Sequence, residues 1–179
     1  MHEKTIRTTV AFRGKLLGLE QLDVELEDGR RGYREIVRHP GAIGVLARHP
    51  DGTFLFVRQY RKAVERAMLE VVAGLLDPGE APEAAARREL EEETGHRAVK
   101  IDWLGTVFPS PGILDEKVEI YVAELDPVPV ARRLDHDERL DVVAMTPAEV
   151  SAAVRGGAIQ DAKTLATWAL WLESGAGAR

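Results

Sequence analysis

Short runs of alternating or continuous apolar residues, separated by turn residues, cover much of the chain and predict β-strands. Asp28-Gly29 and Asp51-Gly52 are tight-turn sequences that join neighbouring runs. The first 38 residues therefore predict an antiparallel hairpin ahead of the remaining strands. The runs predicted as strands are 5–12, 16–26, 33–38, 42–47, 54–59, 68–72, 99–107, 118–123 and 140–144.

The segment that begins at Pro82 carries the signals of a helix. Proline at a first helical position loses no hydrogen bond, and Glu83 lies in the first turn, where the macrodipole favours an anion. Strong helix formers fill the interior as far as Gly95, a typical C-terminal stop. Ala86 and Leu90 share a face that can pack against a sheet.

Two further helices are predicted near the C-terminus. Thr146 and Glu149 form a capping-box sequence around Pro147, and glycines 156–157 end this helix. The last helix covers about residues 161–173, and its aromatic stripe predicts core packing rather than a cofactor site. Strands on both sides of one central helix, then two C-terminal helices, predict an α/β/α sandwich with a mixed sheet.

Composition indicates a globular domain with one sizeable core. The chain has 179 residues, of which 45% are hydrophobic and 30% charged. It has no cysteine, which excludes disulfides, thiolate nucleophiles and zinc ribbons. A net charge of −6 without a basic stripe argues against nucleic-acid binding. No apolar run approaches the roughly 20 residues of a membrane helix, and no signal-peptide core is present, so we expect no membrane partner and a cytoplasmic location.

Three carboxylates of the predicted central helix carry the strongest chemical signal. Glu89, Glu92 and Glu93 are spaced i, i+3, i+4, which places them on one helical face. Like charges so close repel, and hard divalent cations offset them best because such cations prefer carboxylate oxygens. A solvated acidic face is the alternative. The pattern predicts a metal-dependent enzyme that acts on phosphates.

The segment from Gly74 to His96 resembles the Nudix box, Gly-x5-Glu-x7-Arg-Glu-U-x-Glu-Glu-x-Gly-U, where U is a bulky aliphatic residue. Eight fixed positions match over 23 residues. His96 replaces the final aliphatic residue, which normally packs under the helix, and this departure puts the local packing in question. The matching residues are Gly74, Glu80, Arg88, Glu89, Leu90, Glu92, Glu93 and Gly95.

The resemblance implies a Nudix-type sandwich and a divalent metal site. It implies two to three Mg²⁺ ions, with Mn²⁺ as an alternative, bound by the three glutamates and by the backbone carbonyl of Ala73. Arg88 precedes Glu92 by four residues and can also reach back to Glu80. We therefore expect Arg88 to orient carboxylates rather than contact substrate.

Within the Nudix superfamily, two segments are similar to ADP-ribose pyrophosphatases. The stretch 57–61 resembles a segment that precedes the box in those enzymes. By this resemblance Arg61 contacts the substrate diphosphate, and Arg58 is a second candidate. Arginine suits phosphate because its planar fork donates two parallel hydrogen bonds. Solvation of an edge strand is the alternative reading of both arginines.

The second similar segment is the loop 110–116. Pro111 restricts its backbone, and Gly112 can adopt conformations closed to other residues. Its place after the box resembles that of the proline that marks ADP-ribose pyrophosphatases. The resemblance implies that this loop holds Glu116 against the terminal ribose or a water. An ordinary turn is the alternative.

A general base is expected in the polar loop 134–139. Related ADP-ribose hydrolases take a catalytic glutamate from a loop at about this place, and Glu138 is the match. Asp135 and Asp137 are close alternatives, and His136 has a suitable intrinsic pKa.

Taken together, these features predict hydrolysis of a nucleoside diphosphate linked to a second group. ADP-ribose, cleaved to AMP and ribose 5-phosphate, is the expected substrate. Another nucleotide sugar, a dinucleotide, an oxidised nucleoside triphosphate and a non-catalytic ligand-binding module are the alternatives. The predicted organisation is an N-terminal β segment at 1–38, a Nudix domain at 39–173 and a flexible tail at 174–179. By resemblance, the N-terminal segment takes part in a homodimer.

Overall fold

The computed structural model describes residues 1–134 and 139–175. Asp135, His136, Asp137 and Glu138 lie outside the described residues. The chain forms two compact units, each built from two segments: Met1–Gly41 with Phe108–Lys117, and Ala42–Val107 with Val118–Arg179.

The first unit contains a three-stranded antiparallel sheet of β1 (Glu3–Arg13), β2 (Gly18–Leu26) and β3 (Arg31–Arg38), in that order. The predicted N-terminal antiparallel sheet is therefore confirmed. Gly29 makes the turn between β2 and β3 with a φ of 81°, a left-handed value that glycine adopts without strain. β1 is exposed along its whole length.

The second unit is built on a mixed sheet in the order β10-β5-β4-β9-β8. β4 and β9 run parallel at its centre, and the other pairs are antiparallel. β6 pairs with β5, and β7 pairs with β4. The strands are β4 (Ala42–Arg48), β5 (Phe54–Arg61), β6 (Arg66–Glu70), β7 (Val72–Leu75), β8 (Ala98–Val107), β9 (Val118–Leu125) and β10 (Leu140–Met145).

The run 68–72, predicted as one strand, is divided between two strands in the structure. β6 ends at Glu70 and β7 begins at Val72, and the two pair with different neighbours. Between them, the backbone N–H of Val71 donates to Thr164 Oγ1 at 3.0 Å. A side chain from the last helix thus takes the hydrogen bond at the point where the chain changes strand partner.

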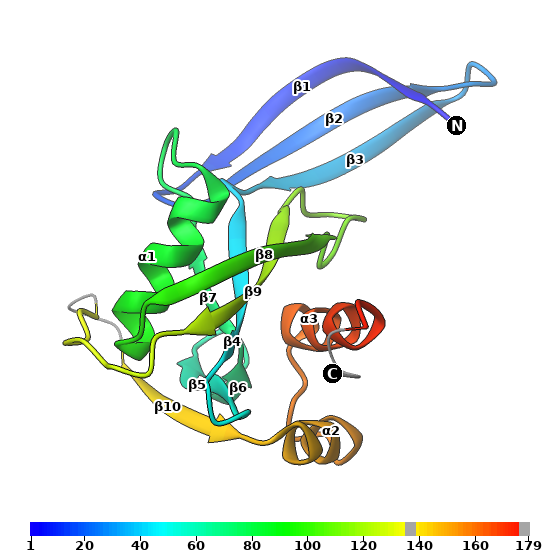
Figure 1. Cartoon of the computed structure of the whole chain (residues 1–179). Coiled ribbons are helices and arrows are strands. Elements are labelled where there is room, and N and C mark those ends of the chain that lie inside the picture. The colour runs from blue at the N-terminus through cyan, green and yellow to red at the C-terminus, as the bar shows by residue number, and fades with distance from the viewer. Residues whose placement is uncertain (135–138, 176–179) are drawn as a thin grey trace. The chain divides into compact units, whose positions relative to one another are not determined.

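Helices cover both faces of the central sheet, as predicted for an α/β/α sandwich. Figure 1 shows α1 (Pro82–Thr94) on one side, with α2 (Pro147–Arg155) and α3 (Ala162–Glu173) on the other. Leu90 of α1 packs in one buried cluster, while Trp168 and Trp171 of α3 pack in a second. Burial of these two apolar layers is the main stabilising term of the unit.

The helix ends follow the sequence signals. Gly95 caps α1 in the left-handed conformation, with a φ of 73°. Thr146 and Glu149 form the predicted capping box around the first turn of α2. These local signals therefore determine where the helices begin and end.

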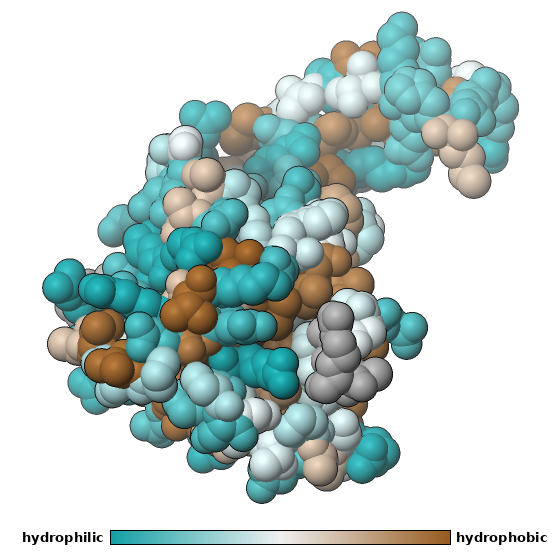
Figure 2. Space-filling model, in the orientation of Figure 1, coloured by the Kyte–Doolittle hydropathy of each residue, from teal (hydrophilic) through white to brown (hydrophobic). Residues whose placement is uncertain are grey.

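The face drawn in Figure 2 is largely hydrophilic, with apolar side chains scattered among charged ones. Such mixing is ordinary for protein surfaces. Within the described residues, no helix combines the length and apolar character needed to cross a membrane.

Candidate active site

The three predicted carboxylates of α1 differ in their surroundings. Glu93 is only 2% exposed, whereas Glu89 and Glu92 line an open pocket. The i, i+3, i+4 spacing puts them on adjoining parts of the helix surface. α1 packs against β7 and β4, so the carboxylates lie beside the strand that carries Ala73 and Gly74.

Gly74 makes room for Glu89. A Cβ atom built on Gly74 would lie 2.0 Å from Glu89 Cδ and 2.1 Å from Oε1. No real Cβ contact is that short, so any larger residue would displace the carboxylate. The first glycine of the box therefore leaves the space beside β7 that the Glu89 carboxylate occupies.

Arg88 orients the carboxylates, as the sequence predicted. Its Nε and Nη2 donate to the two oxygens of Glu80 at 3.0 and 2.8 Å. Its Nη1 donates to Glu89 at 2.7 Å and to Glu92 at 3.2 Å. The Arg88 hydrogen bonds hold the pKa of Glu80 below its ordinary value. One guanidinium thus fixes the direction of three box carboxylates.

These groups open onto a polar pocket of about 540 Å³. It brings together four of the residues predicted from the sequence: Arg61, Ala73, Glu89 and Glu92. It also contains Gln59, Asp77 and Arg133, which sequence reasoning missed. Gln59 could have been found, because strand alternation puts it on the same face as Arg61. The lining residues are Gln59, Arg61, Ala73, Gly74, Leu75, Asp77, Arg88, Glu89, Glu92 and Arg133.

The donor set of this pocket suits a hard divalent cation. Glu89 and Glu92 supply carboxylate oxygens, and Ala73 lines the same pocket. Among residues 1–134 and 139–175, no three His, Cys, Asp or Glu side chains lie together in the arrangement of a metal site. The Arg88 guanidinium lies against Glu89 and Glu92 and offsets their charge. The ligand chemistry therefore fits, while Glu93 is buried and is not among the lining residues.

Arg58 is not brought to this pocket. Alternate residues of β5 point to opposite faces of the sheet, so Arg58 shares a face with Phe56, whereas Arg61 shares one with Gln59. Phe56 packs in the cluster formed with α3. Period-two geometry thus separates the two arginines that the sequence pattern placed together.

Arg61 lines the pocket and is also hydrogen-bonded to a buried carboxylate. Its Nε and Nη2 donate to the two oxygens of Glu70, each at 2.7 Å. Lys163 Nζ donates to the same carboxylate. Glu70 was not predicted as a site residue, although a charge within the apolar run 68–72 is a signal that could have identified it.

The loop with Pro111, Gly112 and Glu116 belongs to the first unit. Its backbone is tied to β3, because Val37 N donates to Ile113 O at 2.8 Å and Asp115 N donates to Val37 O at 3.1 Å. Glu116 Oε1 lies 3.8 Å from His39 Nε2. The loop is therefore anchored to the N-terminal sheet and presents Glu116 beside a histidine.

The predicted base Glu138 lies outside the described residues, together with Asp135, His136 and Asp137. The described chain approaches that segment at Arg133. The N–H of Arg133 donates to Glu92 O at 3.2 Å, and its side chain lines the pocket. Arg133, which precedes Asp135 by two residues in the sequence, is therefore the pocket residue nearest to the candidate base along the described chain.

His96, the departure from the box pattern, has its own polar partner. Its Nδ1 lies 3.0 Å from the backbone carbonyl of Asp126. Its ring meets that of His49 edge to face, with centroids 5.6 Å apart. A hydrogen bond and a ring contact thus take the place of aliphatic packing, and Gly95 still caps α1.

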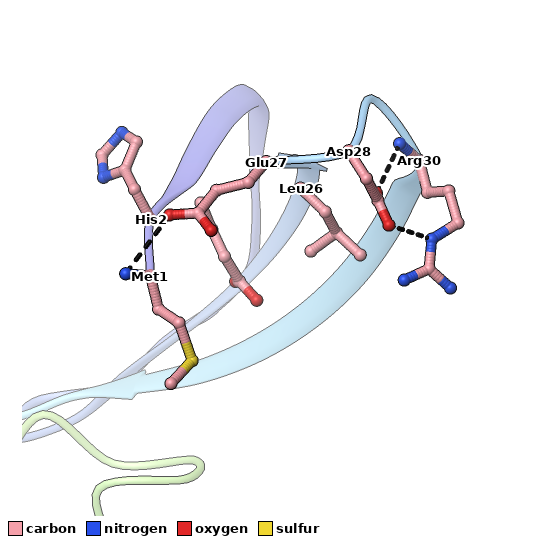
Figure 3. Close-up of a pocket in the computed structure, with 7 residues that line it drawn as sticks. Met1, His2, Leu26, Glu27, Asp28 and Arg30 are labelled. Carbon is pink, nitrogen blue, oxygen red and sulfur yellow. Dashed lines mark hydrogen bonds and ion pairs between the residues drawn. The ribbon is translucent and has the colours of Figure 1, made fainter.

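A separate cavity of about 430 Å³ lies at one end of the N-terminal sheet (Figure 3). The Met1 amino group lies 3.2 Å from Glu27, and Arg30 Nε donates to Asp28 at 2.6 Å. These charges neutralise one another in pairs. None of the residues predicted as site residues from the sequence lines this cavity.

Comparisons with known proteins agree with this geometry. A family model described as a NUDIX domain matches residues 38–168. An ADP-ribose pyrophosphatase of Bacillus subtilis (strain 168) is 43% identical over 165 residues, covering 92% of this chain and 89% of that protein. A methanol dehydrogenase activator of Bacillus methanolicus is 42% identical over 164 residues, covering 91% and 89%. A crystal structure described as an ADP compounds hydrolase superposes with a TM-score of 0.86 at 26% identity, covering 99% of this chain and 96% of that one.

Proposed function

The chain belongs to the NUDIX family, and from this premise we propose that it hydrolyses the diphosphate bond of ADP-ribose to give AMP and ribose 5-phosphate. The box residues are intact, which supports a catalytic protein. The ADP-ribose pyrophosphatase and the ADP compounds hydrolase described above support the substrate class.

One observation carries the proposal. Arg61 and the box carboxylates Glu89 and Glu92 line a single pocket of about 540 Å³. A diphosphate needs cationic donors to bind it and carboxylates to bind the metal that accompanies it. A pocket with both kinds of group, and with little apolar lining, fits the phosphate part of a nucleotide better than it fits an apolar ligand.

Nudix hydrolases use divalent metal ions. We propose that Glu89, Glu92, Glu93 and the carbonyl of Ala73 bind Mg²⁺, two to three ions per site, with Mn²⁺ as a substitute. Such ions neutralise charge that develops on phosphate oxygens and lower the pKa of a bound water. Because Glu93 is buried and is not among the residues that line the pocket, its part in this set is the first to test.

The side chains of the protein then have distinct tasks. Arg61 holds the diphosphate through its guanidinium, and Arg88 keeps Glu80, Glu89 and Glu92 in place. Glu138 accepts a proton from the attacking water, whose oxygen bonds to one phosphorus while the bridging P–O bond breaks. Alignment of these groups supplies much of the rate enhancement in phosphoryl transfer.

The loop 110–116 is the second segment that resembles ADP-ribose pyrophosphatases. We propose that Pro111 and Gly112 shape this loop and that Glu116 contacts the terminal ribose or a water. The hydrogen bonds between this loop and β3 support a fixed loop conformation. Arg58 remains a lesser candidate for substrate contact, because its face of β5 is opposite that of Arg61.

We propose that the protein is a homodimer that pairs through its N-terminal β segment, residues 1–38. β1 is exposed along its whole length, and Val10 and Phe12 are among its exposed apolar residues. Light scattering after size exclusion tests this, with a chain lacking residues 1–38 as the comparison. A cytoplasmic location is part of the proposal and is tested by cell fractionation.

The experiment that tests the activity is product analysis by chromatography after incubation with Mg²⁺ and ADP-ribose. Parallel reactions contain ADP-glucose, NADH, a diadenosine polyphosphate or 8-oxo-dGTP. Selective release of AMP and ribose 5-phosphate from ADP-ribose is the expected result. Turnover of another compound would support the proposed metal site but contradict the proposed substrate specificity. No turnover of any compound, with Mn²⁺ also tried, would favour a ligand-binding module without catalysis.

A further inference from the structure

A buried carboxylate binds one of the residues that line the polar pocket. Glu70 is the last residue of β6 and is 1% exposed. It accepts two parallel hydrogen bonds from Arg61, each at 2.7 Å, and a third from Lys163. One anion is therefore shared by two cations, of which only Arg61 lines the pocket.

The surroundings of Glu70 keep it ionised. Burial acts to raise its pKa, but the hydrogen bonds from Arg61 and the charge of Lys163 outweigh burial, so the pKa lies below its ordinary value. Asp161 lies 3.1 Å from Lys163 and balances the second cation. These four side chains form a neutral group, which is the condition under which charges are tolerated in a protein interior.

Helix α3 holds the carboxylate in place. Lys163 is in the first turn of α3, and Asp161 caps that helix by accepting the N–H of Thr164 at 2.9 Å. Thr164 in turn accepts the N–H of Val71, the residue after Glu70, at 3.0 Å. Both the side chain and the following backbone of Glu70 are therefore fixed by the start of α3.

The contact with Glu70 determines the orientation of the Arg61 guanidinium. A guanidinium is planar and carries five N–H groups in a rigid fork. Glu70 accepts from the edge formed by Nε and Nη2, so the edge formed by Nη1 and the second Nη2 hydrogen points away from Glu70. The Arg61 side chain is 39% exposed and lines the pocket.

We propose that Glu70 is a positioning residue for substrate binding: it fixes the Arg61 guanidinium so that the Nη1/Nη2 edge is ready to bind the diphosphate. Lys163 supports this role by holding Glu70 from α3. The inference rests on the proposed function for the identity of the ligand. A pre-oriented fork binds more tightly because less side-chain freedom is lost when the phosphate arrives.

A double-mutant cycle tests the inference. Glu70→Gln keeps the size of the side chain but leaves one acceptor oxygen and puts an amide donor against the guanidinium. We expect its KM for ADP-ribose to rise about tenfold with kcat within about threefold, the pattern of lost binding. Arg61→Ala should raise KM at least as much. The double variant should match Arg61→Ala within about twofold, because Glu70 acts through Arg61.

A purely structural role for Glu70 predicts a different pattern. Its effect on KM would then be as large in the Arg61→Ala background as in the native one, and that result would overturn the inference. An unchanged KM in a folded Glu70→Gln protein would do the same. Glu173→Gln, at the exposed end of α3, is the matched control and should leave KM unchanged.

Two further measurements keep the test decisive. If Glu70→Gln does not fold, judged by circular dichroism, Glu70→Asp retains the charge but is too short for both hydrogen bonds, and a raised KM is again expected. If the native protein releases no AMP from ADP-ribose, the proposed function fails, and the same cycle is measured as the dissociation constant of inorganic pyrophosphate by calorimetry. The same non-additive pattern there supports positioning by Glu70, and no change overturns it.

Discussion

Gly74 and Glu89 approach so closely that a methyl group on Gly74 would overlap the Glu89 carboxylate, at 2.0 Å from Cδ. The pair joins β7 to α1 and puts the carboxylate at the wall of the polar pocket. The observed position of Glu89, a predicted metal ligand, therefore depends on the absence of a side chain at position 74.

Gly74→Ala should therefore lower turnover by about 100-fold or more, because displacement of Glu89 misplaces a group in the reaction site. The measurement is kcat for ADP-ribose at saturating Mg²⁺, with thermal unfolding recorded in parallel. Gly18→Ala is the control, since a Cβ there meets its neighbours at 3.8 Å. Native turnover in Gly74→Ala would mean that Glu89 can move without consequence.

Arg88→Lys should raise the Mg²⁺ concentration needed for half-maximal activity and lower kcat by about 10- to 100-fold. The reason is that a single ammonium cannot bind three carboxylates as the planar fork does. The readout is activity as a function of Mg²⁺ concentration. Arg87→Lys is matched in sequence position and change, and Arg87 forms its ion pair with Glu83 on the exposed side of the helix, at 2.9 Å. Equal effects of the two substitutions on activity would show that Arg88 has no special role in orienting the carboxylates.

Glu93→Gln should abolish most Mg²⁺-stimulated activity if this buried carboxylate is a metal ligand, with a loss of about 100-fold expected. Glu91→Gln is the control, because Glu91 pairs with Arg97 away from the pocket. Full Mg²⁺-stimulated turnover in a folded Glu93→Gln protein would show that the proposed ligand set is wrong.

Glu138→Gln should slow turnover by about 10²- to 10⁴-fold with a modest change in KM, the usual size of general-base assistance. Asp135→Asn and Asp137→Asn are the comparison variants. Near-native turnover in Glu138→Gln, with a large loss in one of the others, would transfer the role of base to that neighbour.

Acid should remove the stabilisation that Glu70 provides. The folded-state pKa of Glu70 is lowered from 4.5, so its contribution is full above that pH and is lost as the pH falls through the folded pKa. The free energy of unfolding, measured with urea between pH 7 and pH 3, should fall less steeply below pH 4.5 in Glu70→Gln than in the native protein. Glu173→Gln should follow the native curve. Parallel curves for Glu70→Gln and the native protein would contradict this assignment.

Much of the active-site helix could be predicted because its determinants are local. The spacing of Glu89, Glu92 and Glu93 and the stop at Gly95 lie within one helix, and the structure has α1 ending at Thr94 with Gly95 as its cap. The role of Arg88 could also be predicted, since Glu92 lies one turn away and Glu80 shortly before the helix.

The contacts around Arg61 could not be predicted in the same way. Glu70 and Lys163 are 93 residues apart, and their contact depends on where α3 packs against the sheet. Strand alternation puts Arg58 and Arg61 on opposite faces, but only the packing of α1 and α3 shows which face carries the pocket. The run 68–72 is likewise divided where Val71 donates its N–H to Thr164 of α3, a contact between distant segments.

The sequence by itself determined the family, the extent of the central helix and the carboxylates it carries, because short-range spacing and end signals are sufficient for these. Only the tertiary structure decided which arginine enters the pocket, why a side chain at position 74 would displace Glu89 and which buried carboxylate binds Arg61. These depend on pairing and packing between segments far apart in the chain, and local patterns contain no information about such distances.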